Sequence, residues 1–218
     1  MNVRGEKGER VVCAMRCLML DVDGVLVTGR PEDGRSWATD IECDLGISPD
    51  RLQADFFAPH WGAIVTGRKQ LTDVLADCLL DLVAGVSVSD FMDYWFARDA
   101  RLDDAVLAAC GSLRARGIRV FLATNQEHER ARYLMDRLGL GAHVDGIVYS
   151  AAVGAKKPDR AFFDAALAIS GSAPGETLLV DDTRANVDAA QAAGWHAAHW
   201  LPDGDLSELA ERVLTEAT

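Results

Sequence analysis

Two aspartates, Asp21 and Asp23, stand at the end of the first clearly apolar run of the sequence, CLMLDVDGVLVTG. The run is typical of a fully buried strand, where charged groups are costly unless they are paired or hold a metal ion. Side chains two residues apart point to the same side of a strand. We therefore expect both carboxyl groups to face one point, where one could attack while the other transfers protons.

Polar residues follow three later apolar runs in the same way. They are Thr124 and Asn125, then Lys156 and Lys157 in GAKKPD, and finally Asp181 and Asp182. Ligand sites in open parallel sheets form beyond the carboxyl ends of the strands. If these runs are parallel strands of one sheet, four acids, a hydroxyl and a lysine meet at one edge.

Such a set of residues is suited to phosphoryl transfer. Carboxylates that lie close together repel each other unless a cation is among them, and oxygen ligands alone favour a hard ion such as Mg²⁺. One carboxylate can then stay an ionised nucleophile, and its attack on phosphorus gives an aspartyl-phosphate. A lysine and a hydroxyl neutralise and orient the transferring group. A second carboxylate would protonate the leaving alkoxide and later activate water.

The elements that must position these residues alternate regularly from about Asp103 onward. Apolar runs typical of buried parallel strands cover 17–23, 118–125, 146–150, 177–182 and 195–200. Helical spacing covers 102–117, 127–141, 159–170, 184–194 and 205–217. This alternation predicts an α/β fold, a Rossmann-like three-layer core around a parallel sheet. Right-handed crossovers then bring every strand's carboxyl end to the same edge.

A stretch that begins at about Arg30 interrupts the alternation and has the pattern of helices at 48–57, 71–85 and 87–100. An all-helical insertion after the first strand would lie over the carboxyl edge of the sheet, where a lid belongs. We therefore predict three parts. They are an N-terminal extension 1–16, a catalytic core 17–29 and 100–218, and a small helical cap 30–99. Met1 and Met15 are both candidates for the native start.

Composition limits the class of partner. The formal net charge of −12 and the pI of about 4.8 do not favour nucleic acid, which is bound through clustered Lys and Arg. No apolar run approaches the ~18 residues that cross a bilayer, so we expect no membrane contact. Five scattered cysteines without a C-x-x-C pair indicate reduced thiols and a cytoplasmic protein. We expect a monomer or a homodimer.

Four motifs, DVDGVLV, LATN, KKPD and VDDTRANVDAA, resemble in order those of the haloacid dehalogenase (HAD) superfamily of phosphohydrolases. The resemblance covers nearly the whole chain from Cys17 and includes a helical cap inserted after the first motif. The stretch HWGAIVTGRKQLTDVLAD and the doubled Asp181–Asp182 look most like the branch with sugar-phosphate phosphatases and the phosphatase domain of soluble epoxide hydrolases. The resemblance implies a hydrolase with Mg²⁺ as cofactor and a small phosphomonoester as substrate.

The resemblance also implies a role for each matching residue. Asp21 would be the nucleophile, and Asp23 the acid and base, with its backbone carbonyl on Mg²⁺. Thr124 would hydrogen-bond the phosphoryl oxygens, and the neighbouring Asn125 would help to orient the site. Lys157, directly before a proline, would neutralise both nucleophile and phosphate.

The metal and substrate contacts are implied in the same way. Asp182 is the first choice for the side-chain ligand that joins Asp21 on Mg²⁺, and Asp181 is the second. Gly24 would let the chain turn toward the cap beside the phosphate. GAIVTGRK approaches the phosphate-loop pattern, but Arg68 replaces its lysine and no strand precedes it. Arg68 is either a substrate contact on a cap turn or an ordinary solvated residue.

Three alternative functions remain open at this point. A phosphotransferase or phosphomutase would pass the phosphoryl group to a sugar hydroxyl instead of water. A 2-haloacid dehalogenase is less favoured, because family members that cleave carbon–halogen bonds lack an acid at the position of Asp23. A non-catalytic ligand-binding protein could keep the fold without turnover.

Overall fold

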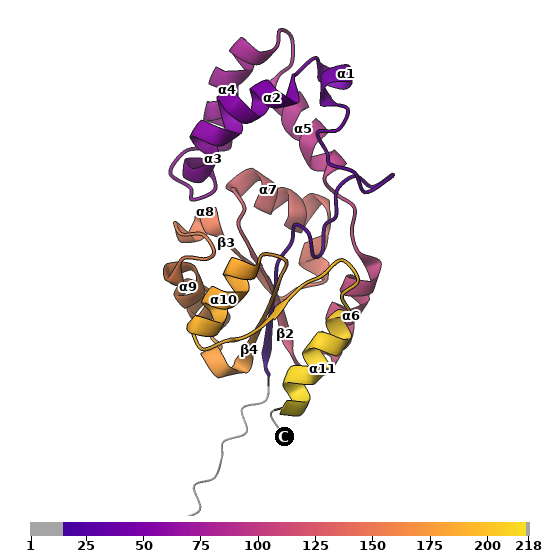
Figure 1. Cartoon of the computed structure of the whole chain (residues 1–218), viewed down its shortest axis with the longest axis vertical. Helices are drawn as coiled ribbons and strands as arrows, with labels where there is room; N and C mark the ends of the chain where they lie inside the picture. Colours follow the sequence, from indigo (N-terminus) through magenta and orange to yellow (C-terminus); the bar gives the residue numbers. More distant parts are fainter. Residues whose placement is uncertain (1–14, 217–218) are drawn as a thin grey trace, which may run out of the picture.

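The computed structural model describes residues 15–216 and places five parallel strands in one sheet, in the order β3-β2-β1-β4-β5 (Figure 1). The strands are β1 (Cys17–Leu20), β2 (Arg119–Thr124), β3 (Gly146–Tyr149), β4 (Thr177–Asp181) and β5 (His196–His199). Each strand lies within an apolar run that the sequence predicts as a strand. The predicted α/β fold is therefore confirmed.

The central position of β1 brings its polar end next to the ends of two neighbours. Leu20 pairs with Leu122 of β2 on one side and with Val180 of β4 on the other. The Asp21 backbone N–H then continues the ladder by donating to the carbonyl of Val180 at 2.9 Å. As a result, the residues that follow β1, β2 and β4 all start from the same edge.

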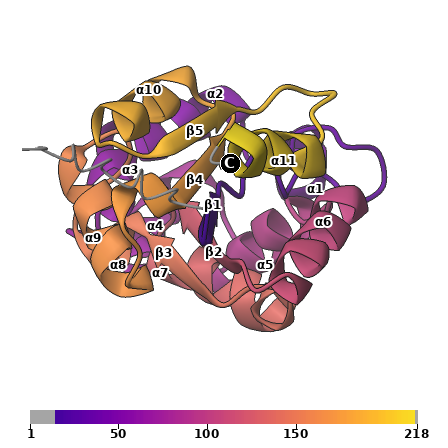
Figure 2. The ribbon, with the colours of Figure 1, turned by 90° about the horizontal axis from the view of Figure 1, so that it is seen from below.

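Helices cover both faces of the sheet, as Figure 2 shows from below, with α6 and α11 on one side and α9 on the other. The core helices are α6 (Asp104–Ala115), α7 (His128–Arg132) with a π-helical turn (Tyr133–Arg137), α8 (Ser150–Val153), α9 (Arg160–Ser170), α10 (Arg184–Ala192) and α11 (Leu206–Glu216). Short 3₁₀ turns occupy Leu140–Ala142 and Pro174–Glu176. The Rossmann-like three-layer arrangement is that expected from the sequence.

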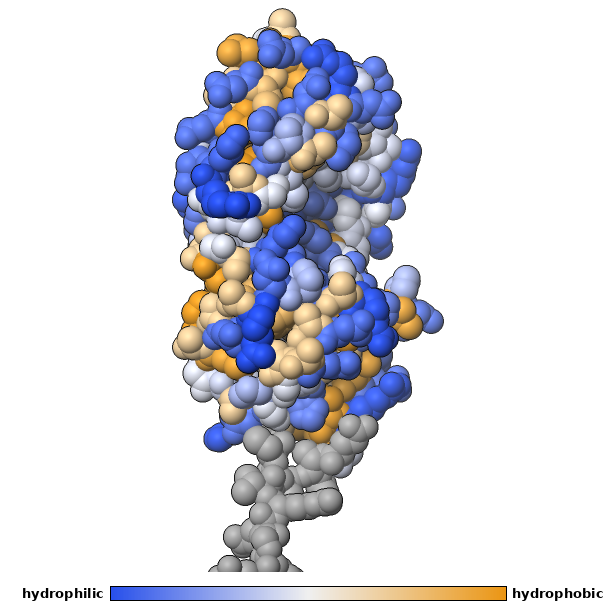
Figure 3. Space-filling view, turned by 60° about the vertical axis from the view of Figure 1, so that its left-hand side comes forward, coloured by the Kyte–Doolittle hydropathy of each residue, from blue (hydrophilic) through white to orange (hydrophobic). Residues whose placement is uncertain are grey.

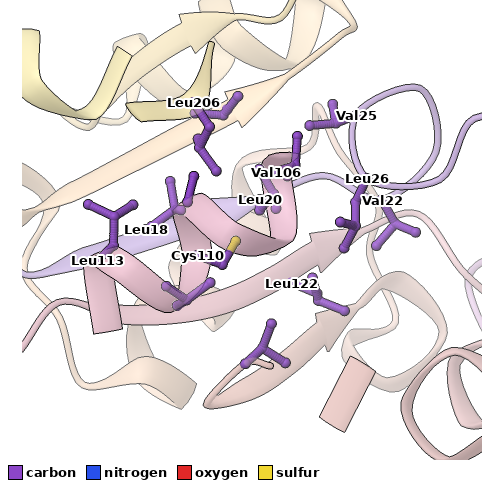
Figure 4. Packing of buried hydrophobic residues seen from close by; sticks show 14 of the residues in the cluster. Leu18, Leu20, Val22, Val25, Leu26, Val106, Cys110, Leu113, Leu122 and Leu206 are labelled. Carbon is purple, nitrogen blue, oxygen red and sulfur yellow. The ribbon is translucent and has the colours of Figure 1, made fainter. Parts of the chain in front are cut away.

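Alternation along β1 supplies both layers of the core. Leu18 and Leu20 pack against Cys110 of α6 and Leu206 of α11 (Figure 4). On the opposite face, Met19 belongs to a second cluster that includes side chains of α9 and α10. Because a strand buried on both faces is apolar at every position, β1 reads as a continuous apolar run up to Asp21.

A separate helical segment lies between β1 and α6 in the sequence, and we call it the cap. Its helices are α1 (Ile41–Leu45), α2 (Pro49–Leu52), a π-helical turn (Gln53–Phe57), α3 (Ala58–Ile64), α4 (Leu71–Leu82) and α5 (Val88–Arg98). These helices enclose a hydrophobic cluster of their own, which includes Phe56, Leu75 and Phe91. Figure 1 shows the cap beyond the carboxyl edge of the sheet. The division of the chain into domains at residues 30 and 99 stays a prediction.

Two short extended segments connect the cap to the core and run side by side. The Thr28 N–H donates to the carbonyl of Arg101 at 2.9 Å, and the Arg101 N–H donates to the carbonyl of Gly29 at 3.0 Å. Val27 and Leu102 form an antiparallel bridge between them. The chain thus leaves and re-enters the core through one paired linker.

The described residues cover only part of the predicted N-terminal extension. Residues 1–14 of the predicted extension lie outside the described residues, whereas Met15 is buried in the core. The described cysteines are all free thiols. No helix within residues 15–216 is long and apolar enough to cross a bilayer. On the face drawn in Figure 3, hydrophilic residues predominate and hydrophobic ones form small scattered patches.

Candidate active site

Asp21 lies at the end of β1 in a nearly closed environment and is 8% exposed. Its Oδ1 accepts a hydrogen bond from the backbone N–H of Val22 at 2.8 Å and lies 3.0 Å from Nζ of Lys157. Burial raises the pKa of the Asp21 carboxyl, the Lys157 ammonium opposes that effect, and the nearby Asp181 and Asp23 add to it. The lysine therefore favours the ionised form that a nucleophile needs.

Lys157 is buried between two carboxylates. Its Nζ lies 2.5 Å from Oδ2 of Asp181, in addition to the contact with Asp21. Burial by itself would lower the pKa of the lysine, but the two carboxylates raise it above its ordinary value. Lys156 is exposed, so the side chain that reaches the site is that of Lys157.

Asn125 holds the backbone of Lys157. Its Oδ1 accepts from the Lys157 N–H at 2.8 Å, and its Nδ2 donates to the Lys157 carbonyl at 3.0 Å. The residue after β2 thereby fixes the loop that carries the lysine. The neighbouring Thr124 is 1% exposed, and its hydroxyl has no hydrogen-bond partner among residues 15–216. That hydroxyl is free to donate to a ligand.

Asp181 and Asp182 have different surroundings although they are adjacent. Asp181 is fully buried, and its Oδ1 accepts from the Thr183 N–H at 2.8 Å and from Nδ2 of Asn186 at 2.9 Å. Asp182 is exposed and faces Gly24, where a Cβ atom would lie 2.2 Å from its Oδ2. Gly24 also has a φ of +78°, which favours glycine. The positive φ therefore favours glycine in the turn after β1, and a larger side chain there would displace the Asp182 carboxylate.

Asp23 is held by a residue that the sequence does not single out. Nε2 of Gln126 donates to Oδ2 of Asp23 at 2.6 Å. Asp23 is exposed, yet the surrounding protein displaces part of its hydration and raises its pKa to about 6. The negative charge of Asp99 adds to this effect, while Arg130 and Gln126 oppose it. A carboxyl with a pKa in this range can both give and take a proton near neutral pH.

Known proteins share these motifs and this fold. A family model described as a haloacid dehalogenase-like hydrolase matches residues 15–194. The chain belongs to the haloacid dehalogenase-like hydrolases. The resemblance drawn from DVDGVLV, LATN, KKPD and VDDTRANVDAA is thus confirmed at the level of the family.

Individual relatives of this HAD-like hydrolase share 30% or less of its sequence in the three comparisons that follow. A phosphoglycolate phosphatase of Pseudomonas putida is 30% identical over 186 residues, which cover 82% of this chain and 66% of that protein. The chain thus spans just under two thirds of that relative. A HAD-like hydrolase structure from Porphyromonas gingivalis has a TM-score of 0.73 at 21% identity and covers 92% of this chain and 98% of its own. The structure of a HAD family enzyme of Bacteroides thetaiotaomicron, solved with magnesium and inorganic phosphate, has a TM-score of 0.74 at 18% identity. The match covers 89% of this chain and 98% of that enzyme.

The acidic residues of this HAD-like hydrolase fit a hard divalent cation. Asp21, Asp181 and Asp182 each offer a carboxylate oxygen, and the three oxygens lie within 4.8 Å of one another. Such a group of carboxylates is stabilised by a cation, and oxygen ligands suit Mg²⁺. The oxygens of Asp181 already accept hydrogen bonds from Lys157 and Asn186, whereas Asp182 is exposed. This difference favours Asp182 over Asp181 as the direct ligand.

Arg68 is the one candidate that the structure does not bring to the other site residues. Its guanidinium donates to Oγ1 of Thr66 at 3.0 Å and to the carbonyl of Gly62 at 3.3 Å, both within the cap. It lines a small groove of the cap with Lys69 and Asp73. A substrate contact by Arg68 stays a prediction that would need movement of this side chain.

The sequence motifs do not single out Gln126 or Asn186 as candidate site residues. Gln126 directly follows the motif LATN, at a point where the chain still runs along the carboxyl edge of the sheet. Asn186 lies in the first turn of α10 and faces Asp181. Polar residues that follow a strand end are hard to distinguish from ordinary loop residues until their partners are known.

Proposed function

We propose that this chain is a Mg²⁺-dependent phosphatase that hydrolyses a small phosphorylated metabolite through an aspartyl-phosphate on Asp21. The observation that carries the proposal is the pairing of Asp21 with Lys157 at 3.0 Å, beside a second carboxyl, Asp23, that is held by its own donor. A nucleophilic carboxylate needs a counter-charge, and the leaving group needs a proton. Both are present at one edge of the sheet.

In the first half of the proposed reaction, a carboxylate oxygen of Asp21 attacks phosphorus and the bond from phosphorus to the ester oxygen breaks. The carboxyl proton of Asp23 passes to that oxygen, so the product leaves as an alcohol. The Lys157 ammonium and the Thr124 hydroxyl would bind phosphoryl oxygens, where charge accumulates. Bound Mg²⁺, held by Asp21, Asp182 and the Asp23 carbonyl, would supply further positive charge.

In the second half, the ionised Asp23 accepts a proton from water while the water oxygen attacks phosphorus. The bond between phosphorus and Asp21 breaks, which restores the carboxylate and releases inorganic phosphate. Asp23 is then protonated again, so no external acid or base is consumed. One residue can serve as acid and then as base because the proton that it gives to the leaving oxygen is replaced by one from the attacking water.

The relatives support a small phosphomonoester as the substrate. The Pseudomonas putida relative carries the name phosphoglycolate phosphatase, and the Bacteroides thetaiotaomicron structure holds magnesium and inorganic phosphate. We propose a small substrate, such as a phosphorylated carboxylic acid or sugar. The cap lies over the strand ends and restricts the access of protein surfaces to the site (Figure 1).

A panel of phosphorylated metabolites, assayed for phosphate release with and without Mg²⁺, tests the proposal. We expect Mg²⁺-dependent turnover of at least one phosphomonoester, and a loss on the order of 10³-fold or more in Asp21→Asn. Asp164→Asn is the matched control, because Asp164 is an exposed acid that pairs with Arg160 on α9. Turnover that survives in Asp21→Asn would contradict the proposal. Conversion of a hexose phosphate to its isomer without phosphate release would favour the mutase.

A further inference from the structure

Gln126 makes the only described side-chain hydrogen bond to Asp23 within residues 15–216. Its amide nitrogen lies 2.6 Å from Oδ2, and the side chain is 3% exposed. The contact is made by the NH₂ end, because the amide oxygen would repel a carboxylate. A buried amide that faces a proton-transfer group from this distance limits the orientations that the group can adopt.

The backbone of Gln126 is itself fixed from two sides. Its carbonyl accepts a hydrogen bond from the Ala151 N–H at 3.1 Å at the start of α8. Oγ of Ser150 lies 3.1 Å from the same carbonyl and 2.5 Å from the carbonyl of Val65, which belongs to the cap. Ser150 is fully buried. The donor that holds Asp23 is therefore anchored where core and cap meet.

Asp23 has a particular need for such an anchor. It follows the end of β1 in a tight turn, and it is exposed, whereas Asp21 is buried. In contrast to Asp21, it has no ammonium group in hydrogen-bond contact among the described residues. An acid that must meet the leaving oxygen loses much of its effect when it is displaced by about 1 Å. With Oδ2 held by Gln126, Oδ1 is the oxygen that stays available for proton transfer.

We propose that Gln126 is a positioning residue that holds Asp23 in the orientation needed to protonate the leaving group. This inference rests on the proposed phosphatase function and assigns a role to a residue outside the four motifs. It predicts that removal of the amide harms proton transfer in particular. Binding of the phosphoryl group by Lys157 and Thr124 should persist, because among residues 15–216 the Gln126 side chain forms no hydrogen bond with either of them.

The test compares two substrates in Gln126→Met, which keeps the length of the side chain and removes the donor. An alkyl phosphomonoester needs a proton on its leaving oxygen, whereas p-nitrophenyl phosphate releases a stable phenolate without one. We expect kcat/KM for the alkyl substrate to fall by about 10- to 100-fold, and that for p-nitrophenyl phosphate by no more than a few fold. The affinity for inorganic phosphate should stay close to that of the wild type.

Gln191→Met is the matched control, because Gln191 is an exposed glutamine on α10 whose amide donates to the carbonyl of Ala197 at 3.2 Å. It should change neither substrate's kcat/KM. Equal losses on both substrates in Gln126→Met would overturn the inference, since they indicate a general structural defect, and so would the absence of any loss. If wild-type protein hydrolyses neither substrate with Mg²⁺, the proposed function itself fails, which is a separate outcome.

Discussion

At the scale of single residues, the site depends on Lys157, whose ammonium group contacts two carboxylates. Lys157 lies between Asp21 and Asp181, and Asp181 is in turn held by Asn186 and the Thr183 N–H. A buried ammonium is tolerated because two carboxylates neutralise it and hydrogen bonds fix the geometry. Asp181 therefore orients Lys157, and the charge of Lys157 favours the ionised form of Asp21. Asp182 is exposed, and its Oδ1 accepts a hydrogen bond from the Thr183 hydroxyl at 3.2 Å, which leaves its Oδ2 for a different role.

Gly24→Ala tests the proposed role of Asp182. A Cβ at position 24 would lie 2.2 Å from Oδ2 of Asp182, so the carboxylate must move away from the metal group. We expect Mg²⁺ affinity, measured by calorimetry, to fall by about 10- to 100-fold, as is typical when the support of a metal ligand is lost. The left-handed backbone adds a strain of roughly 1 kcal/mol to the folded state.

Gly171→Ala provides the comparison, because Gly171 has a φ of +65° and nothing within 4 Å of a Cβ. It shares the backbone strain but lies at the C-terminal end of α9, away from the acids. We expect lower stability with unchanged Mg²⁺ affinity. Equal affinity in both variants would show that Asp182 does not bind the ion, or that it binds without the support of a glycine at position 24.

At the scale of elements, the cap contacts the core through the turn after α3 and through α5, in addition to the paired linker. The turn after α3 packs on α8, where Val65 meets Ser150. On the other side, the buried Arg130 of α7 donates to the carbonyl of Phe96 at 3.1 Å, and its guanidinium lies 3.4 Å from a carboxylate oxygen of Asp99. Ser150 of the first contact also donates to the carbonyl of Gln126, and Arg130 of the second contact acts on Asp23 through its charge. Movement of the cap and the geometry of the acid are therefore expected to be linked.

Gly67→Ala tests the contact between the cap turn and α8. Gly67 has a φ of +71°, and a Cβ there would lie 2.4 Å from the carbonyl oxygen of Ala151. Because that oxygen belongs to the backbone, the turn itself must move. We expect the free energy of unfolding in urea to fall by about 2 kcal/mol or more, the sum of left-handed strain and a lost contact.

The control for this prediction is Gly85→Ala, since Gly85 has a φ of +86° and open space around a Cβ. It should cost only the strain of roughly 1 kcal/mol. If both variants lose the same stability, the close approach of Gly67 to Ala151 contributes nothing.

Long elements with clear periodicity could be predicted from the sequence, and short ones could not. The strand at the centre of the sheet and helices such as α6 and α9 carry an unbroken apolar pattern, so their positions follow from it. Helices α1 and α8 have five and four residues, which is too short to show a repeat of 3.6. The helix after LATN begins where expected but turns π-helical at Tyr133. The Tyr133 ring packs against Phe96 of the cap, a tertiary contact that cannot be predicted from a local sequence pattern.

Candidate site residues divide in a similar way. Asp21, Asp23, Thr124 and Lys157 could be found because parallel strands end at one edge, a rule that holds for any sequence of this class. Gln126 could not, because its role depends on a distance to Asp23 across more than 100 residues of chain. Arg68 carries the positive charge that a phosphate contact requires, but its guanidinium donates to partners within the cap.

At the scale of the whole molecule, segments far apart in the sequence form one site. Some of its residues are buried and others are exposed to solvent. The cap lies over the strand ends, while a groove of about 1200 Å³ runs along the linker and β5 and reaches Gly24 and Asp182. Asp182 is exposed to this groove, whereas Asp21 and Lys157 are buried beside it. The groove thus offers a path for ions and water to the proposed metal ligand.

The central claim is that Asp21 carries the phosphoryl group during turnover. The most direct measurement is acid quenching of the enzyme within one turnover of an active phosphomonoester and Mg²⁺, followed by mass spectrometry of the peptide that contains residues 17–28. We predict that this peptide gains the mass of one phosphoryl group on Asp21, that the adduct disappears after treatment with hydroxylamine, and that Asp21→Asn shows none. Turnover without any adduct on this peptide, or an adduct on another residue, would contradict the account.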